Sequence, residues 1–196
     1  MDFQPIDPAS PSEGNHVQKA VVFALALTSL IAVNATGSVT NVSSLLDRAN
    51  HLNAEELQMA RSVQDKARDN QALIAFATVL AADHRANENA LLTLSRQKKI
   101  GIEGTSSSSN SQVEVLDRLQ GVQFKEAFLS DEINRNEEAL DYFLQAKQEF
   151  MGDPQVEYYI GRTIPILNAH LELARNLQHA MTREKLISSL LLLGYD

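Results

Sequence analysis

The chain has 196 residues, a formal net charge of −8 and no cysteine. This length suits one domain with a sizeable core, and the lack of cysteine excludes disulfides, thiolate metal sites and thiol nucleophiles. No basic run is longer than the Lys98-Lys99 pair, so the electrostatic footprint of a nucleic-acid-binding protein is missing. We therefore expect a single domain that does not bind nucleic acid.

An apolar segment, AVVFALALTSLIAV, occupies residues 20–33, and small residues after it permit cleavage behind Ala35. Its length matches the apolar core of a signal peptide and falls short of the roughly 20 residues that span a bilayer. The stretch before this segment is acidic, whereas signal peptides usually begin with basic residues. A start codon assigned too far upstream would explain the difference. We interpret residues 1–35 as a leader and predict a periplasmic or secreted protein. A retained membrane anchor or a buried helix is the alternative.

Apolar residues recur at steps of three and four through the rest of the chain, which predicts helices and no strands. Asn70 is the predicted N-cap of the second helix, and Asp153-Pro154 opens the fourth with an N-cap followed by proline. Thr182 is predicted to cap a separate, short apolar helix that packs against the end of the other helices. The four long helices are expected at about residues 45–67, 71–99, 124–150 and 154–177.

A connection of about twenty-five residues, with a short helix near residues 113–121, separates the second and third long helices. The other connections are short. One long crossover is typical of the ferritin-like topology rather than of simple up-and-down bundles. We therefore predict an all-α protein: a ferritin-like four-helix bundle over residues 36–181, followed by the apolar C-terminal helix over 182–196.

Polar residues interrupt the inward face of every predicted long helix: Glu56 on the first, His84 on the second, Asn136 with Glu132 on the third and His170 on the fourth. One interpretation is a satisfied polar network that fixes the register of the helices. The other is a single divalent metal ion, such as zinc, iron or manganese, held by His84, His170, Glu56 and Glu132.

Two patterns limit the metal interpretation. The Glu-x-x-His motifs of di-iron bundles are absent from the chain. Residues 53–56 also resemble a capping box, and a helix that began there would turn Glu56 away from the core.

The chain carries no glycine-rich phosphate loop, no nucleophile elbow and no His-Glu-x-x-His motif. This favours a protein without enzymatic activity, and no small-molecule substrate can be identified from the sequence. The apolar run around Leu190 to Leu193 is compatible with binding to a protein partner or with a homo-oligomer.

Three segments, FATVLAADHRAN (76–87), LDRLQGVQFKEAFL (116–129) and TIPILNAHLELARNL (163–177), resemble the ferritin-like bacterial proteins grouped as domain of unknown function 4142. ANHLNAEELQMARSVQDKA (49–67) resembles their first helix, so the similarity covers about residues 45–178. The resemblance implies a ferritin-like bundle that is usually exported and has no established activity. Its recurrent polar positions fall on Glu56, Asp83, His84 and His170.

One departure concerns the third helix, where the family usually has Asp-His and this chain has Arg135-Asn136. The missing imidazole weakens a metal site, whereas a structural network survives, with Arg135 expected to pair with Asp83. Its expected members are Glu56, Asp83, His84, Arg135, Asn136 and His170. We therefore expect an exported structural or interaction module of the cell envelope. The alternative is a metal-binding protein with a storage, stress or redox role.

Overall fold

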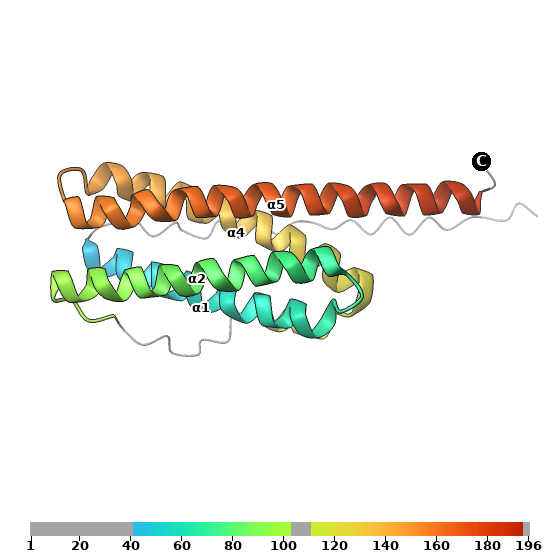
Figure 1. Cartoon of the computed structure of the whole chain (residues 1–196), viewed down its shortest axis with the longest axis horizontal. Coiled ribbons are helices and arrows are strands. Elements are labelled where there is room, and N and C mark those ends of the chain that lie inside the picture. Colours follow the sequence, from blue (N-terminus) through green and yellow to red (C-terminus); the bar gives the residue numbers. More distant parts are fainter. Residues whose placement is uncertain (1–40, 103–110, 194–196) are drawn as a thin grey trace, which may run out of the picture. The chain divides into compact units, whose positions relative to one another are not determined.

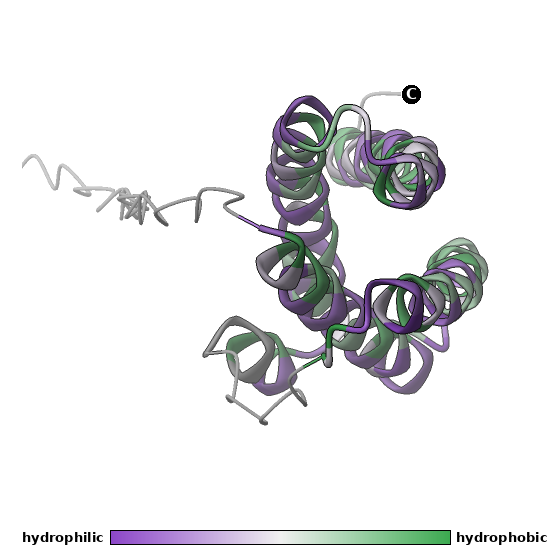
Figure 2. Cartoon of the chain, turned by 90° about the vertical axis from the view of Figure 1, so that its left-hand side faces the viewer, coloured by the Kyte–Doolittle hydropathy of each residue, from purple (hydrophilic) through white to green (hydrophobic). Residues whose placement is uncertain are grey.

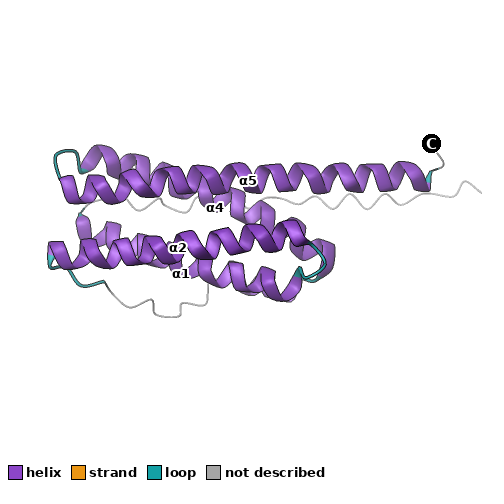
Figure 3. Ribbon diagram, viewed as in Figure 1, coloured by secondary structure: helices purple, strands orange, loops and turns teal. Residues whose placement is uncertain are grey.

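The computed structural model describes residues 41–102 and 111–193, which all belong to the second of two units, Met1–Ala35 and Thr36–Asp196. The predicted leader lies outside the described residues. The described part is helical without strands (Figure 3), which confirms the all-α class. Its helices are α1 (Val42–Lys66), α2 (Gln71–Lys98), α3 (Ser111–Arg118), α4 (Gly121–Glu149) and α5 (Pro154–Leu192).

Helix α1 begins at an N-cap that the sequence analysis did not single out. The side chain of Asn41 accepts a hydrogen bond from the backbone N–H of Ser44 at 2.8 Å, and the Ser44 hydroxyl lies 3.3 Å from the Asn41 backbone nitrogen. This reciprocal capping box starts the helix well before Asn53. The alternative start at Asn53 is therefore wrong, and Glu56 lies in the middle of α1 with its side chain buried.

The predicted caps of α2 and α5 are confirmed. Asn70 accepts a hydrogen bond from the backbone N–H of Leu73 at 3.0 Å, and Asp153 accepts one from Val156 at 3.3 Å. Pro154 occupies the first helical position, where its missing N–H leaves no intrahelical bond unmade. Local chemistry therefore fixes where these two helices begin.

The long helices neighbour one another in the cyclic order α1, α2, α5, α4. Figure 2 shows the helices nearly end-on around a common interior. Short turns make α1 antiparallel to α2, and α4 antiparallel to α5. The hydroxyl of Tyr142 donates to the carbonyl of Ser44 at 3.2 Å, so the end of α4 lies beside the start of α1. Lys98 at the end of α2 likewise meets Asp153 at the start of α5. Consequently α2 and α4 run in the same direction, and residues 99–120, which include α3, connect them.

Two apolar clusters fill the interior, one toward each end of the helices. On α1, for example, the first cluster ends at Leu52 and the second begins at Leu57. Between the clusters, each long helix contributes buried polar side chains, which we call the polar layer. Its members are Asn53, Glu56, His84, Asn87, Asp131, Glu132, Asn136, Thr163 and His170.

The predicted separate helix after Thr182 is wrong, because α5 continues without a break to Leu192 (Figure 1). The Thr182 hydroxyl donates to the carbonyl of Gln178 at 2.9 Å, four residues earlier in the same helix. It therefore acts as an ordinary helical threonine rather than as a cap. In the part of the chain that the structure describes, neither α5 nor any other helix is both long and apolar enough to cross a membrane.

Candidate functional site

The structure places the predicted inward residues inside the protein. Glu56, His84, Glu132, Asn136 and His170 each expose 2 % or less of their surface. They come from all four long helices, and because the layer lies between two apolar clusters, their charges and hydrogen bonds are shielded from water. Such groups are costly unless they are paired, so their partners decide what the layer does.

Arg135 joins α4 to α1. Its Nε and Nη2 atoms donate to Oε1 of Glu56 at 3.0 and 2.9 Å, and Nη1 lies 3.2 Å from a carboxylate oxygen of Glu55. Asp131, one turn earlier on α4, lies 3.7 Å away. The predicted pairing of Arg135 with Asp83 is therefore wrong, because Arg135 projects toward α1 whereas Asp83 projects from α2 toward α5.

Glu56 and Glu132 form a carboxyl pair with unequal acidities. Burial favours the neutral form of both groups, but the Arg135 guanidinium lowers the pKa of Glu56 below its usual range. Burial and the negative charge of Glu56 raise the pKa of Glu132 well above its usual range. The raised pKa favours the protonated form of Glu132 beside the Glu56 carboxylate. Asn136 completes the arrangement by donating to Oε1 of Glu132 at 2.8 Å.

His84 joins α2 to α1 through Asn53, which the sequence analysis did not select. The Nδ1 atom of His84 lies 3.0 Å from the amide oxygen of Asn53. Because that oxygen only accepts, Nδ1 carries the hydrogen and Nε2 presents a lone pair. Burial lowers the pKa of His84 to about 4, so the ring is neutral near pH 7. Its buried Nε2 atom has no hydrogen-bond partner among the described residues.

His170 joins α5 to α2 through Asp83. The Nε2 atom of His170 donates to a carboxylate oxygen of Asp83 at 2.9 Å. In the neutral ring this leaves Nδ1 as the lone-pair nitrogen, and that atom is also buried without a partner in the described structure. The rings of His84 and His170 lie 5.3 Å apart, centre to centre. Two imidazole lone pairs therefore occur close together in the layer.

The four residues predicted as metal ligands do not meet as a ready ligand set. No group of three or more His, Asp or Glu side chains within the described residues is arranged to hold a metal ion. Glu56 is engaged by Arg135, and Glu132 is held protonated beside it. The ring nitrogens without a hydrogen-bond partner in the described structure are Nε2 of His84 and Nδ1 of His170, and the Oε2 atoms of Glu56 and Glu132 also have none.

A second polar group lies next to the histidines and was not selected from the sequence. The Thr163 hydroxyl on α5 lies 3.3 Å from the side-chain oxygen of Asn87 on α2 and 3.0 Å from the carbonyl of Tyr159. Burial raises the pKa of the Tyr159 phenol, which therefore stays neutral. Asn87 follows His84 by three residues, and that spacing on one helix face was the available signal.

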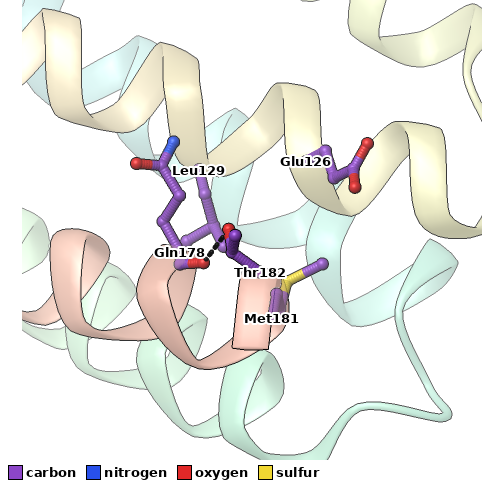
Figure 4. Close-up of a pocket in the computed structure, with 5 residues that line it drawn as sticks. All are labelled: Glu126, Leu129, Gln178, Met181 and Thr182. Atoms are coloured by element: carbon purple, nitrogen blue, oxygen red, sulfur yellow. Dashed lines mark hydrogen bonds between the residues drawn. The ribbon is translucent and has the colours of Figure 1, made fainter. Parts of the chain in front are cut away.

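The surface hollow between α4 and α5 is a weaker candidate site. It has a volume of about 210 Å³ and is lined by Glu126, Leu129, Gln178, Met181 and Thr182 (Figure 4). Its single charged group, Glu126, is already paired with Lys185 at 2.9 Å. The hollow therefore offers no converging set of polar groups, and the polar layer remains the candidate site.

A family model described as "Domain of unknown function (DUF4142)" matches residues 30–177. The chain belongs to this family. The match includes every member of the polar layer and ends before the last turns of α5. No curated protein and no solved structure matches the chain. Membership in the DUF4142 family therefore attaches no activity to the layer, and its chemistry has to be argued from its geometry.

Proposed function

We propose that this DUF4142 protein is an exported, ferritin-like four-helix bundle that acts as a structural or interaction module of the cell envelope. The directions of the helices support the topology: α2 and α4 are parallel and are connected by residues 99–120, which gives one long crossover. Export is supported by the apolar segment at residues 20–33 and the small residues that follow it.

The observation that carries the structural role is how the polar layer is paired. Asn53 and His84 join α1 to α2, Asp83 and His170 join α2 to α5, and Arg135 and Glu56 join α4 to α1. Sliding one helix by a turn, about 5.4 Å, would separate its buried polar groups from their partners on the neighbouring helices. The layer therefore penalises incorrect register, which apolar packing alone tolerates more easily.

Replacing the two histidines tests this role. We expect His84→Leu and His170→Leu each to leave a folded, helical protein with lower stability. For His84→Leu the cost is on the order of 1–3 kcal/mol, because the buried Asn53 loses its partner. For His170→Leu the cost is smaller, because the Asp83 side chain is 38 % exposed and water can replace the lost bond. Urea unfolding monitored by circular dichroism measures the change. His179→Leu, at an exposed position on α5, is the matched control. Unchanged stability in both His84→Leu and His170→Leu would contradict the register role.

Export is tested separately, by fusing residues 1–45 to a reporter enzyme that is active only outside the cytoplasm. We expect an active fusion and a product cleaved behind Ala35. A fusion carrying two charged residues in place of Leu25 and Leu27 serves as the control, because it lacks the apolar core that export requires. An inactive wild-type fusion would contradict the envelope assignment and leave the register role untouched.

A second candidate function is metal binding, and the two free imidazole nitrogens favour it. Each histidine has its other ring nitrogen held by an oxygen acceptor, Asn53 for His84 and Asp83 for His170. Metal-binding histidines commonly have such a partner, because it fixes the tautomer and orients the lone pair. Zinc, iron and manganese accept nitrogen and oxygen ligands, and Glu132 would supply a carboxylate by releasing its proton.

Elemental analysis of protein purified without chelator tests this second candidate, together with thermal melts in zinc, iron and manganese. A cation that binds only the native state raises the melting temperature. We expect such a shift to be lost in His84→Ala and retained in His179→Ala. If no metal co-purifies and no melt shifts, the histidines act only as structural groups.

A further inference from the structure

Helix α5 has a C-terminal extension, residues 182–193, in which every residue is exposed. Figure 1 shows this red end of α5 continuing past the ends of α1 and α2. Its apolar side chains are unusually open to solvent: Leu186 59 %, Ile187 50 %, Leu190 41 %, Leu191 61 %, Leu192 88 % and Leu193 72 %. Contiguous apolar surface of this kind is typical of an interaction site rather than of a free monomer surface.

The extension does not simply prolong the core-facing side of α5. The inward residues Ala174, Leu177 and Met181 continue, at steps of four and three, to Lys185 and Ser188, which are polar. Leu186, Ile187 and Leu190 fall on the opposite side of the helix, with Leu193 at its edge. Leu192 follows Ser188 on the inward side, and Leu191 lies between the two sides. In the part of α5 before the extension, that opposite, outer side is polar and carries Glu172, Asn176 and His179. It becomes apolar only after Arg183.

We propose that a second copy of this chain covers the extension, with the two apolar stripes packed antiparallel about a twofold axis. A twofold contact requires a surface that is complementary to itself. A stripe of leucine and isoleucine meets this requirement, because apolar contacts need no opposite charges on the partner. A contact limited to this short stripe is small compared with specific interfaces, which bury about 1,200–2,000 Å² in total. We therefore expect a weak, reversible dimer.

A membrane surface fits the extension less well. Helices that lie on membranes usually combine an apolar face with several lysines and arginines. The extension has only Arg183 and Lys185, the negative Glu184 lies between them, and Lys185 is already paired with Glu126. The short helical extension is therefore better suited to a copy of itself.

Sedimentation velocity of the full chain, from about 1 to about 200 μM, tests the proposal. We expect the mean mass to rise from that of one chain toward twice that value. The variant carrying Ile187→Lys and Leu190→Lys should weaken dimerisation at least tenfold, because each lysine places a charge in the apolar contact. The control carries Leu144→Lys and Leu173→Lys, at positions with 48 % and 41 % exposure outside the extension, and should dimerise normally.

A wild-type chain that stays monomeric at the highest concentration overturns the proposal, and so does equal dimerisation of the wild-type and extension variants. Pelleting with phosphatidylcholine and phosphatidylglycerol vesicles, lost in the extension variant and without dimers in solution, would show that the partner is a membrane. If deleting residues 1–35 abolishes the difference between the two variants, the apolar leader and not a second copy covers the stripe. Circular dichroism confirms that each variant is folded.

Discussion

His84 and Glu132 lie in the same polar layer, and both are neutral near pH 7 for the same reason. Burial disfavours the charged form of any group, so it lowers the pKa of an imidazole and raises that of a carboxyl. Arg135, which borders the layer, stabilises the charged form of Glu56 instead. Charge is therefore concentrated around Arg135, beside Glu55, Glu56 and Asp131, and this limits the desolvation cost of the other polar groups.

Acidification is expected to destabilise the protein through His84. In the unfolded chain its pKa is about 6.5, whereas in the fold burial lowers the pKa to about 4. As the pH falls through this window, His84 becomes protonated in the unfolded state but stays neutral in the native state. The free energy of unfolding therefore drops by about 3 kcal/mol in all. Urea unfolding from pH 7.5 to 4 measures this loss.

The variant His84→Asn isolates this effect, because its amide nitrogen replaces Nδ1 as a donor to Asn53 but does not titrate. The difference in stability between wild type and variant should shrink or reverse as the pH falls. Comparing variants is necessary because burial raises the pKa of Asp131 to about 6, which has the opposite pH dependence. A difference that stays constant across the window would contradict a buried, neutral His84.

Glu132→Gln is expected to stabilise the protein at pH 8. The raised pKa of Glu132 means that stability is greatest below its unfolded pKa and falls as the pH rises, since the unfolded state then ionises and the native state does not. Glutamine resembles the protonated acid but does not ionise, so the variant does not lose stability as the pH rises. We expect a gain on the order of 1 kcal/mol at pH 8 that disappears near pH 4. Denaturant titrations at the two pH values measure it, and a loss of stability at pH 8 would argue that Glu132 is ionised in the fold.

At the scale of the elements, polar contacts fix how the helices are rotated and offset. Arg135 on α4 is held by Glu55 and Glu56 on α1, where direct contact between the two helices is otherwise limited. At the N-terminal end of α4, Lys125 pairs with Asp69 in the turn between α1 and α2 at 2.5 Å. These contacts position α4 against a neighbour that lies far from it in sequence.

Arg135→Met is expected to destabilise the protein by about 3–5 kcal/mol, because it leaves the buried Glu56 carboxylate without its counter-charge. Adding Glu56→Gln to the same chain should restore most of this loss, since the unpaired charge is then removed. Arg175→Met is the control: Arg175 pairs with Glu137 on the exposed surface, where a pair contributes about 1 kcal/mol or less. Equal losses for the two arginine variants would show that Arg135 is not a buried partner.

For the whole molecule, the deciding feature is the long connection that makes α2 and α4 parallel. If the connection were short, α4 would begin beside the end of α2 and would run antiparallel to it. Residues 99–120 instead carry the chain back, so that Lys125 near the start of α4 reaches the turn between α1 and α2. This return is what groups the helices as the antiparallel pairs α1 with α2 and α4 with α5.

Zero-length cross-linking with a carbodiimide tests this topology. We expect it to join Lys125 to Asp69 and Lys98 to Asp153, because both pairs are in direct contact at 2.5 Å. Peptide mass spectrometry identifies the links, and Lys125→Arg should remove only the first of them. A link from Lys125 to residues near the end of α2, in place of Asp69, would indicate a simple up-and-down order.

The sequence by itself determined the helical class, the caps at Asn70 and Asp153, and the inward direction of Glu56, His84 and His170. These features depend on spacing and on contacts within a few residues, and such information is local to the chain. It was less reliable where two local patterns competed: Asn53 resembled a cap although Asn41 starts α1, and Thr182 resembled a cap although it lies within α5.

Only the tertiary structure decided which partners the inward residues have. Arg135 meets Glu56 and not Asp83, and His84 meets Asn53, because the rotation and offset of helices far apart in sequence set these contacts. A small rotation about a helix axis exchanges one neighbour for another without changing the periodicity of the sequence. The polar contacts and the packing of the two apolar clusters together fix that rotation, and with it the hydrogen-bond partners of the polar layer.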